Sequence, residues 1–161
     1  MSLFAKLKQI QTEVQTVEKQ GENKFSHYSY VMLGTILNRV NGLLDKHGIV
    51  ITQSEISSEA GLEFTDNGYY STGHVRLRTV ATDSETGEST AVESSGFAAD
   101  KNGDKALFKA TTGARKYGLT MLLKLHWDSV EPEEDTPSLR AKTNSNRKSS
   151  RKPPSKTDTF F

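Results

Sequence analysis

Apolar positions in the first third of the chain recur every three to four residues, which is the spacing of an amphipathic helix. The first stripe comprises Leu3, Leu7, Ile10, Val14 and Val17. Gly21 and the polar residues after it end this segment. A second stripe predicts a helix over residues 31–46 that stops at His47-Gly48. Its apolar members are Leu33, Ile36, Leu37, Val40, Leu43 and Leu44.

The pattern changes to β-branched and alternating residues after the second helix. Residues 49–52 form a β-branched run, residues 62–64 a second short segment, and residues 74–81 alternate apolar with polar side chains. The turn Glu85-Thr86-Gly87-Glu88 leads into a return strand near residues 90–97. We therefore expect an antiparallel sheet of about three strands.

A last helix is predicted over residues 104–125, after a polar loop at residues 100–104, with Asp104 as its N-cap. The order α-α-β-β-β-α indicates an α+β domain in which helices pack on the sheet. At about 100° per residue, one side of the last helix is apolar. That side comprises Leu107, Ala110, Ala114, Tyr117, Met121 and Leu125.

The opposite side of this helix is basic. It carries Lys105, Lys109, Thr112 and Lys116, with Arg115 beside them. These residues either solvate an outer face or face phosphate groups. Residues 105–127 contain five basic side chains and no acid, although mixed signs would give favourable pairs one turn apart. This absence favours phosphate contact.

Two glycines, Gly113 and Gly118, lie inside the same helix, and each costs about 1 kcal/mol relative to alanine. Close approach of a backbone or phosphate group would account for them, and so would tight packing on the sheet.

A second basic surface is predicted on the strand at residues 74–81. His74, Arg76 and Arg78 point to one face of it, and apolar residues to the other. A solvated sheet face explains this pattern equally well. If the strand and the last helix border one groove, both would grip a sugar-phosphate backbone.

Aromatic residues interleave with these basic segments. Phe25, His27, Tyr28 and Tyr30 precede the second helix, beside Lys24. We expect the two tyrosines to pack in the core with their hydroxyls hydrogen-bonded. Tyr69 and Tyr70 lie in a turn-rich stretch and are better candidates for base stacking.

Charge is unevenly distributed although the net charge is only +1. Residues 128–135 hold five acids and no Lys or Arg, and residues 136–161 hold seven basic residues and one acid. Such blocks usually mark interaction tails. We therefore predict a folded domain over residues 1–127 and a disordered tail over residues 128–161.

Several classes of protein are disfavoured. The chain has no cysteine, its apolar runs are too short to cross a bilayer, and its first residues lack a secretory apolar region, so a cytoplasmic location is the default. It has no Walker A loop, HExxH or GxSxG motif, and its four histidines are dispersed. We expect no enzyme activity, no cofactor and no metal site.

Two stretches together resemble the ERF (essential recombination function) family of single-strand annealing proteins. In residues 24–52 the matching positions are Tyr28, Tyr30, Leu43, Leu44, His47, Gly48 and Ile49. In residues 104–125 they are Thr112, Ala114, Arg115, Lys116, Tyr117 and Leu119. The sequence has Gly113 where the family commonly has an aromatic residue, and Lys116 where it usually has Arg. The resemblance covers roughly residues 4–135.

The resemblance implies a phage-type recombination protein that anneals complementary DNA strands without ATP. It also implies homo-oligomeric rings or filaments on single-stranded DNA, in the bacterial host cytoplasm if a phage encodes the chain. The residues that we expect to bind DNA are Arg76, Arg78, Lys105, Lys109, Thr112, Arg115 and Lys116.

Two other functions remain open. The first is an adaptor that recruits host replication or repair proteins, such as a single-strand binding protein, through its tail. The tail ends in two aromatic residues, Phe160-Phe161, that a partner could bind. A metal-dependent nuclease would need the acids of residues 128–135 to hold a cation, but a loose acidic run lacks the geometry for such a site.

Overall fold

The computed structural model describes residues 1–14, 17, 19–23 and 28–126, which lie in the first of two units of the chain, Met1–Asp128. Helices α1 (Leu3–Glu13) and α2 (Leu33–His47) come first. Strands β3 (Ile49–Thr65), β4 (Gly68–Asp83) and β5 (Ser89–Lys101) and helix α3 (Ala106–Leu123) follow. The three strands form one antiparallel sheet in the order β3-β4-β5. The predicted α+β class and element order are confirmed.

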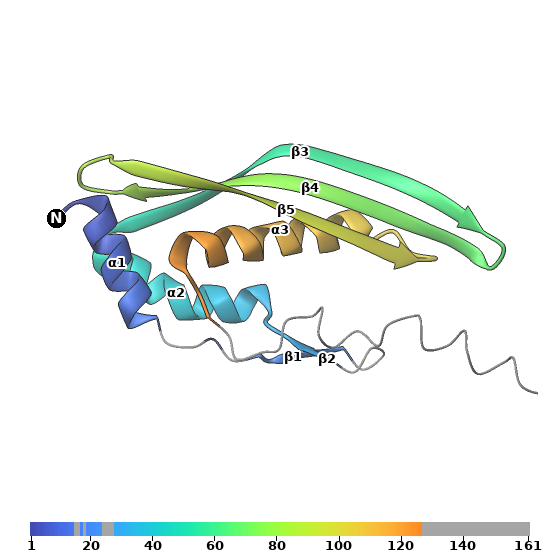
Figure 1. Ribbon diagram of the computed structural model, residues 1–161, viewed down its shortest axis with the longest axis horizontal. Coiled ribbons are helices and arrows are strands. Elements are labelled where there is room, and N and C mark those ends of the chain that lie inside the picture. The colour runs from blue at the N-terminus through green and yellow to red at the C-terminus, as the bar shows by residue number, and fades with distance from the viewer. Residues whose placement is uncertain (15–16, 18, 24–27, 127–161) are drawn as a thin grey trace, which may run out of the picture. The chain divides into compact units, whose positions relative to one another are not determined.

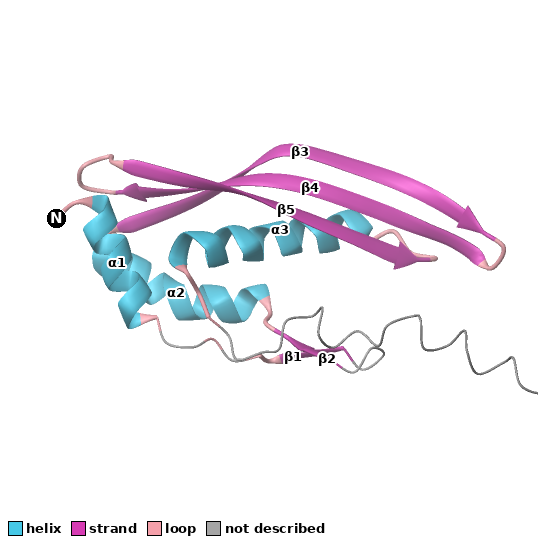
Figure 2. Ribbon diagram, viewed as in Figure 1, coloured by secondary structure: helices cyan, strands magenta, loops and turns pink. Residues whose placement is uncertain are grey.

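The helices lie on one face of this sheet (Figure 1). Helix α3 packs directly against the sheet, α2 lies beyond α3, and α1 lies at the end of the sheet near the β4–β5 turn (Figure 2). The opposite face of the sheet is not covered by any helix of the described part. The core lies between the helices and the helix-facing side of the sheet, where Leu3, Ile10, Ile36, Val40 and Leu123 are fully buried.

Glycines bring α3 unusually close to the sheet. A Cβ on Gly96 of β5 would clash with the carbonyl oxygen of Ala110 and lie 2.7 Å from the amide nitrogen of Ala114. A Cβ on Gly118 of α3 would clash with the hydroxyl group of Thr79. A Cβ on Gly113 would meet nothing nearer than 3.9 Å. Tight packing on the sheet therefore explains Gly118, and nothing in the structure requires glycine at position 113.

The close contact decides which side of α3 is buried. Ala106, Ala110 and Ala114 face the sheet and are buried, as predicted for the last two. The prediction was wrong for Tyr117 and Met121, which are 52% and 55% exposed. A helix held this near the sheet has room only for small side chains in the contact, so the large side chains lie outside it. The larger buried residues of α3 are Leu119, Leu122 and Leu123.

The ends of α3 also differ from the prediction. The residue before its first turn is Lys105, and Asp104 is not the N-cap. Asp100 takes over part of that role, since its Oδ2 accepts a hydrogen bond from the backbone N–H of Lys105 at 3.2 Å. At the other end, Lys124 adopts a left-handed conformation with φ of 48°, which ends the helix two residues earlier than predicted.

The strands are longer than the sequence pattern indicates. The segments predicted at residues 49–52 and 62–64 belong to one strand, β3, which pairs along its whole length with β4. A bulge between Glu55 and Ser57 interrupts their register. Tyr69 and Tyr70, predicted in a turn-rich stretch, form part of β4. The residues that join the two predicted segments, 53–61, are exposed from Ser54 onward and mostly polar, so no continuous apolar alternation marks one long strand.

The N-terminal segment departs from the prediction as well. Helix α1 ends at Glu13, because Val14 has an extended backbone (φ −67°, ψ 107°). Val17, predicted on the helix, is still buried, and its N–H donates to the carbonyl of His126 at 2.9 Å. Strands β1 (Gly21–Asn23) and β2 (Tyr28–Tyr30) form a short antiparallel pair that was not predicted.

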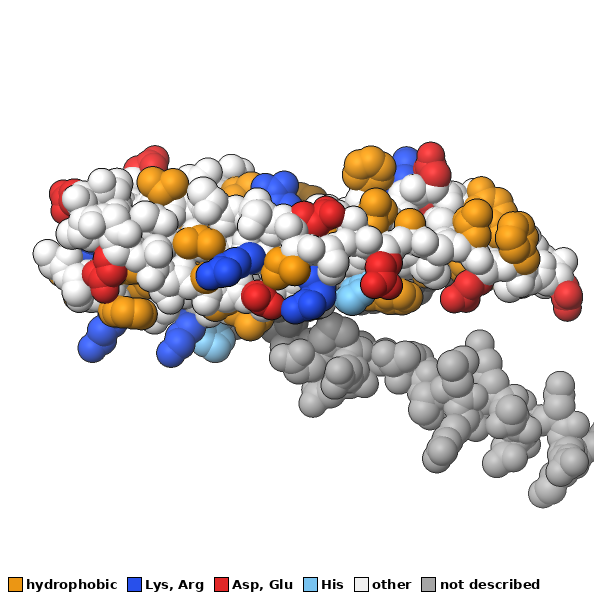
Figure 3. Space-filling view, turned by 90° about the horizontal axis from the view of Figure 1, so that it is seen from above, with side chains coloured by type: hydrophobic (Ala, Val, Ile, Leu, Met, Phe, Trp, Pro, Cys, Tyr) orange, Lys and Arg blue, Asp and Glu red, His pale blue; other side chains and the backbone are white. Residues whose placement is uncertain are grey.

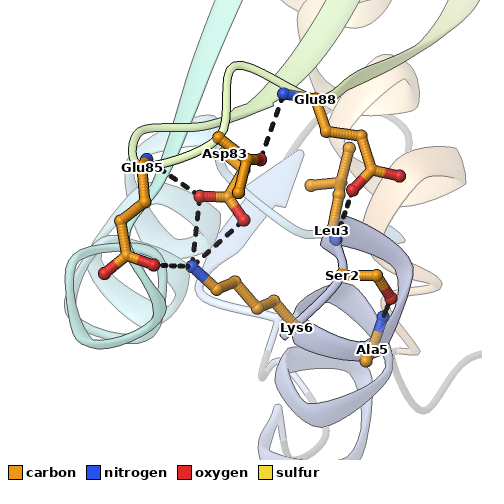
Figure 4. Close-up of polar contacts among 8 residues, drawn as sticks. Ser2, Leu3, Ala5, Lys6, Asp83, Glu85 and Glu88 are labelled. Atoms are coloured by element: carbon orange, nitrogen blue, oxygen red, sulfur yellow. Dashed lines mark hydrogen bonds and ion pairs between the residues drawn. The ribbon is translucent and has the colours of Figure 1, made fainter.

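A buried ion pair fastens α1 to the β4–β5 turn (Figure 4). The Lys6 ammonium lies 3.1 Å and 3.0 Å from the two carboxylate oxygens of Asp83 and 2.9 Å from Glu85 Oε2. Nearby, the Leu3 N–H donates to Glu88 Oε2 at 2.9 Å. The hydrogen bond from the Glu85 N–H, together with the Lys6 ammonium, lowers the pKa of Asp83. Glu85 and Asp83 in turn raise the pKa of Lys6.

We predict opposite effects for two glycine substitutions at this contact. Gly96→Ala should lower the free energy of unfolding by about 2–3 kcal/mol, because its methyl group meets helix backbone that must move. Gly113→Ala should leave stability unchanged or raise it by up to about 1 kcal/mol, because alanine favours the helix. Urea unfolding of both variants measures the difference. Equal losses would contradict the close contact.

We also predict that the contribution of Asp83 depends on pH. Its carboxylate is stabilised in the folded state, so the contribution is complete above the ordinary aspartate pKa of about 3.9 and disappears as the pH falls through the lowered value. The difference in free energy of unfolding between the wild type and Asp83→Asn should therefore shrink below about pH 4. Glu63→Gln, at an exposed position of β3, is the matched control. A difference that is constant from pH 7 to pH 3 would contradict this prediction.

Candidate nucleic-acid interface

The first turns of α3 present a basic stripe to solvent. Because Ala106, Ala110 and Ala114 face the sheet, the residues on the opposite side of the helix point outward. We use the name outer stripe for the exposed residues Lys105, Phe108, Lys109, Thr112 and Arg115. Three of its members are basic and one is a large aromatic residue. Phe108 is 76% exposed.

Arg115 is positioned by the adjacent strand. Its Nε donates to Gln53 Oε1 on β3 at 3.1 Å. Gln53 returns a hydrogen bond from Nε2 to the carbonyl of Arg115 at 3.1 Å and bonds to Thr79 Oγ1 at 3.0 Å. These two hydrogen bonds with Gln53 hold the Arg115 side chain beside β3. A guanidinium group in this setting suits bidentate contact with a phosphate.

The lysine end of the outer stripe lies beside the end of β5. The ammonium group of Lys109 forms an ion pair with Asp100, whose carboxylate also accepts the Lys105 N–H. Lys109, and to a lesser extent the Lys105 N–H, lower the pKa of Asp100. The Lys109 side chain is still half exposed. Exposed pairs of this kind contribute little, so a phosphate can compete for the lysine.

Lys116 differs from the other predicted DNA-binding residues. Its side chain is half-buried, and Nζ donates to the carbonyl oxygen of Val31 at 3.0 Å. The same ammonium group lies 5.7 Å from the centre of the Tyr30 ring, within range of a cation–π contact. Burial lowers the pKa of Lys116. Lys116 thus connects α3 to the segment before α2, and its contact with phosphate stays a prediction.

Arg76 and Arg78 lie on the uncovered face of the sheet. The alternate residues of β4, Val75 and Leu77, pack on Ala110 and Ala114 of α3. The two arginines therefore point away from α3, and the idea of one groove shared by the strand and the helix is wrong within a single chain. Figure 3 shows basic side chains along the middle of this face with acidic ones among them. Arg76 is paired with Glu93 at 2.9 Å.

The aromatic predictions have mixed outcomes. Tyr30 is 39% exposed and packs against Gly21 and Lys116, so it is only partly in the core. Tyr69 and Tyr70 are half-buried in β4. Lys24, Phe25, His27 and the side chain of Tyr28 lie outside the described residues. Phe108 was not predicted, although its position between Lys105 and Thr112 on the outward side was visible in the sequence.

Two further findings concern the described residues alone. They contain no group of three or more His, Asp or Glu side chains that could hold a metal ion. They also contain no helix long and apolar enough to span a membrane. The acidic run at residues 128–135, and the basic tail that follows it, lie outside the described part of the chain.

Comparison with known families decides the classification. A sequence model of the ERF superfamily matches residues 3–159. The chain belongs to the ERF superfamily. This superfamily is associated with single-strand annealing and recombination in phages. The match extends beyond residue 135, where the sequence resemblance ended. No curated protein matches the chain.

Two neighbouring basic residues of this ERF-superfamily chain should behave differently. Lys116→Ala should lower the free energy of unfolding by about 1–2 kcal/mol, because the buried Val31 carbonyl loses its donor. Arg115→Ala removes an exposed side chain and should change stability by no more than about 0.5 kcal/mol. Thermal unfolding of both variants checks this. Equal effects would mean that Lys116 has no structural role.

Proposed function

We propose that this chain binds single-stranded DNA through the outer stripe of α3 and anneals complementary strands without ATP. The observation that carries the proposal is the combination in one exposed stripe of Lys105, Lys109 and Arg115 with the aromatic Phe108. Proteins that bind single strands combine basic residues, which follow the backbone, with aromatic rings on which bases stack.

The dimensions of the stripe suit a short length of DNA. Ten residues separate Lys105 from Arg115, which corresponds to about 15 Å along a helix. That distance matches a few nucleotides of a strand. Stacking of one base on Phe108 would add about 1–3 kcal/mol, and each phosphate contact would add a salt-dependent term. A single chain therefore makes few contacts with DNA.

Few contacts for each chain favour assembly of several chains on one strand. Linked binding sites raise the overall affinity without new contacts, because the second site binds within the same complex. We propose that the chain forms homo-oligomers that hold a strand along successive outer stripes. Annealing then needs no nucleotide hydrolysis, because base pairing itself is downhill in free energy.

Membership of the superfamily supports a phage setting. We propose that the protein acts in homologous recombination of a phage or phage-derived element, in the cytoplasm of the bacterial host. It would act as a binding protein and not as a catalyst. Recruitment of host replication or repair proteins through residues 128–161 stays a prediction, since that segment lies outside the described residues. Arg76 and Arg78 are the second candidate surface for DNA.

The test is annealing of two complementary fluorescent oligonucleotides without ATP, at several salt concentrations. The wild type should accelerate annealing, and the triple variant Lys105→Ala/Lys109→Ala/Arg115→Ala should lose most of this acceleration. Loss of three phosphate contacts should also reduce the slope of log affinity against log salt for single strands by about 2. Fluorescence anisotropy with a labelled oligonucleotide measures that slope.

The matched control is the double variant Arg76→Ala/Arg78→Ala on the uncovered face, with folding of each variant checked by circular dichroism. It should retain most of the activity. A larger defect in the double variant would place DNA on the uncovered face. No acceleration by the wild type, with single strands bound no more tightly than duplex, would reject the annealing function.

A further inference from the structure

A pocket of about 580 Å³ opens where α2, β3 and α3 meet. Its volume lies within the range of about 300–1,000 Å³ that is typical of sites for small organic ligands. Buried apolar residues from all three elements form its floor: Val40, Leu44, Ile49 and Leu119. The polar residues of its lining that are exposed, and therefore border its mouth, are Asn41, Asp45, Glu55 and Arg115. An apolar floor with a few polar groups around it is the usual form of a ligand pocket.

The mouth of this pocket coincides with one end of the outer stripe. Arg115, the last residue of the outer stripe, lines the pocket together with Thr111 of the same helix. Gln53, which also lines it, holds Arg115 there through two hydrogen bonds of 3.1 Å. A strand that follows the outer stripe from Lys105 therefore reaches the pocket at Arg115. The pocket is thus continuous with the surface that we propose for DNA.

Charge decides which part of a nucleotide can enter the pocket. The charged side chains of its lining are the carboxylates of Asp45 and Glu55 and the guanidinium group of Arg115. The two carboxylates would repel a phosphate group, whereas a neutral base is not repelled. Carboxylate oxygens also accept hydrogen bonds from amino groups such as that of cytosine. Arg115 suits the phosphate instead, so the base enters and the phosphate stays at the mouth.

Two polar side chains at the mouth are not used by the fold. Asn41 and Asp45 are one turn apart on α2, so they lie on the same side of the helix. Within the described part of the chain, neither side chain makes a hydrogen bond or an ion pair. The amide of Asn41 offers both a donor and an acceptor, and the carboxylate of Asp45 offers acceptors. Both groups are therefore available to bind the polar edge of a base.

We propose that this pocket holds one nucleobase of a single strand that lies along the outer stripe, while Arg115 binds the adjacent phosphate. The apolar floor replaces water around the base, and Asn41 and Asp45 bind its edge. The inference deepens the proposed function and rests on it, since it states how the same surface holds a strand. One base for each chain is anchored in this way, which leaves the neighbouring bases of the strand free to pair.

The test closes the pocket with a large side chain in the full-length protein. Asn41→Trp places an indole ring at the mouth, and Asn38→Trp is the matched control, because Asn38 is exposed on the same helix but does not line the pocket. Fluorescence anisotropy at low salt measures binding to two labelled strands about ten nucleotides long, oligo-dC and an abasic strand that has the same backbone without bases. Asn41→Trp should weaken binding of oligo-dC about tenfold, the effect of losing one stacked base, and leave binding of the abasic strand unchanged. Asn38→Trp should bind both strands like the wild type.

Three outcomes would overturn the proposal: a wild type that binds both strands equally well, an Asn41→Trp variant that binds oligo-dC normally, or one that loses both strands to the same extent. Circular dichroism checks the fold, and Asp45→Trp replaces Asn41→Trp if the latter unfolds. Failure of the proposed function gives different results. Equal binding of both strands by the wild type would reject the base pocket and leave DNA binding standing. A protein that shows the expected differences but does not anneal DNA would reject annealing and leave the base pocket standing.

Discussion

The close contact between α3 and the sheet determines much of the rest of the structure. Gly73, Gly96 and Gly118 remove the side chains that would hold helix and strands apart. The hydroxyl of Ser94 donates to the carbonyl of Ala114 at 2.8 Å, which shows how near the two backbones lie. Only small residues fit on the inner side of the helix, so its long and charged side chains lie on the outer side. The outer stripe is thus a consequence of the packing beneath it.

The charged residues fall into two groups with different roles. Two are committed within the fold: Lys6 to Asp83, and Lys116 to the Val31 carbonyl. Others lie exposed at the ends or edges of elements, where a ligand can compete for them. The sequence pattern does not distinguish the two groups. It therefore placed the half-buried Lys116 and the exposed Arg115 together on one basic side of the helix.

The sequence predicted the order of the large elements, because their apolar residues follow helical or alternating spacing. It did not predict the length of β3, because the exposed residues that join its two predicted segments are mostly polar and interrupt the alternation. The prediction that Tyr117 and Met121 belong to the buried side of α3 was wrong, because helical spacing alone does not reveal that alanine and glycine form the contact with the sheet. Phe108 could have been found, since it lies among the predicted outward residues, whereas the partners of Lys116 depend on residues 85 positions away.

The position of the Lys6–Asp83 ion pair also has a consequence for how the chain folds. Its two partners are 77 residues apart in the sequence, whereas β3, β4, β5 and α3 follow one another and contact their neighbours directly. Closing a long loop carries a larger entropic cost than closing a short one. The hairpins and α3 can therefore form first, and α1 docks only after the β4–β5 turn exists. During synthesis the first helix to leave the ribosome therefore waits for the β4–β5 turn, and its apolar side stays uncovered until that turn has emerged.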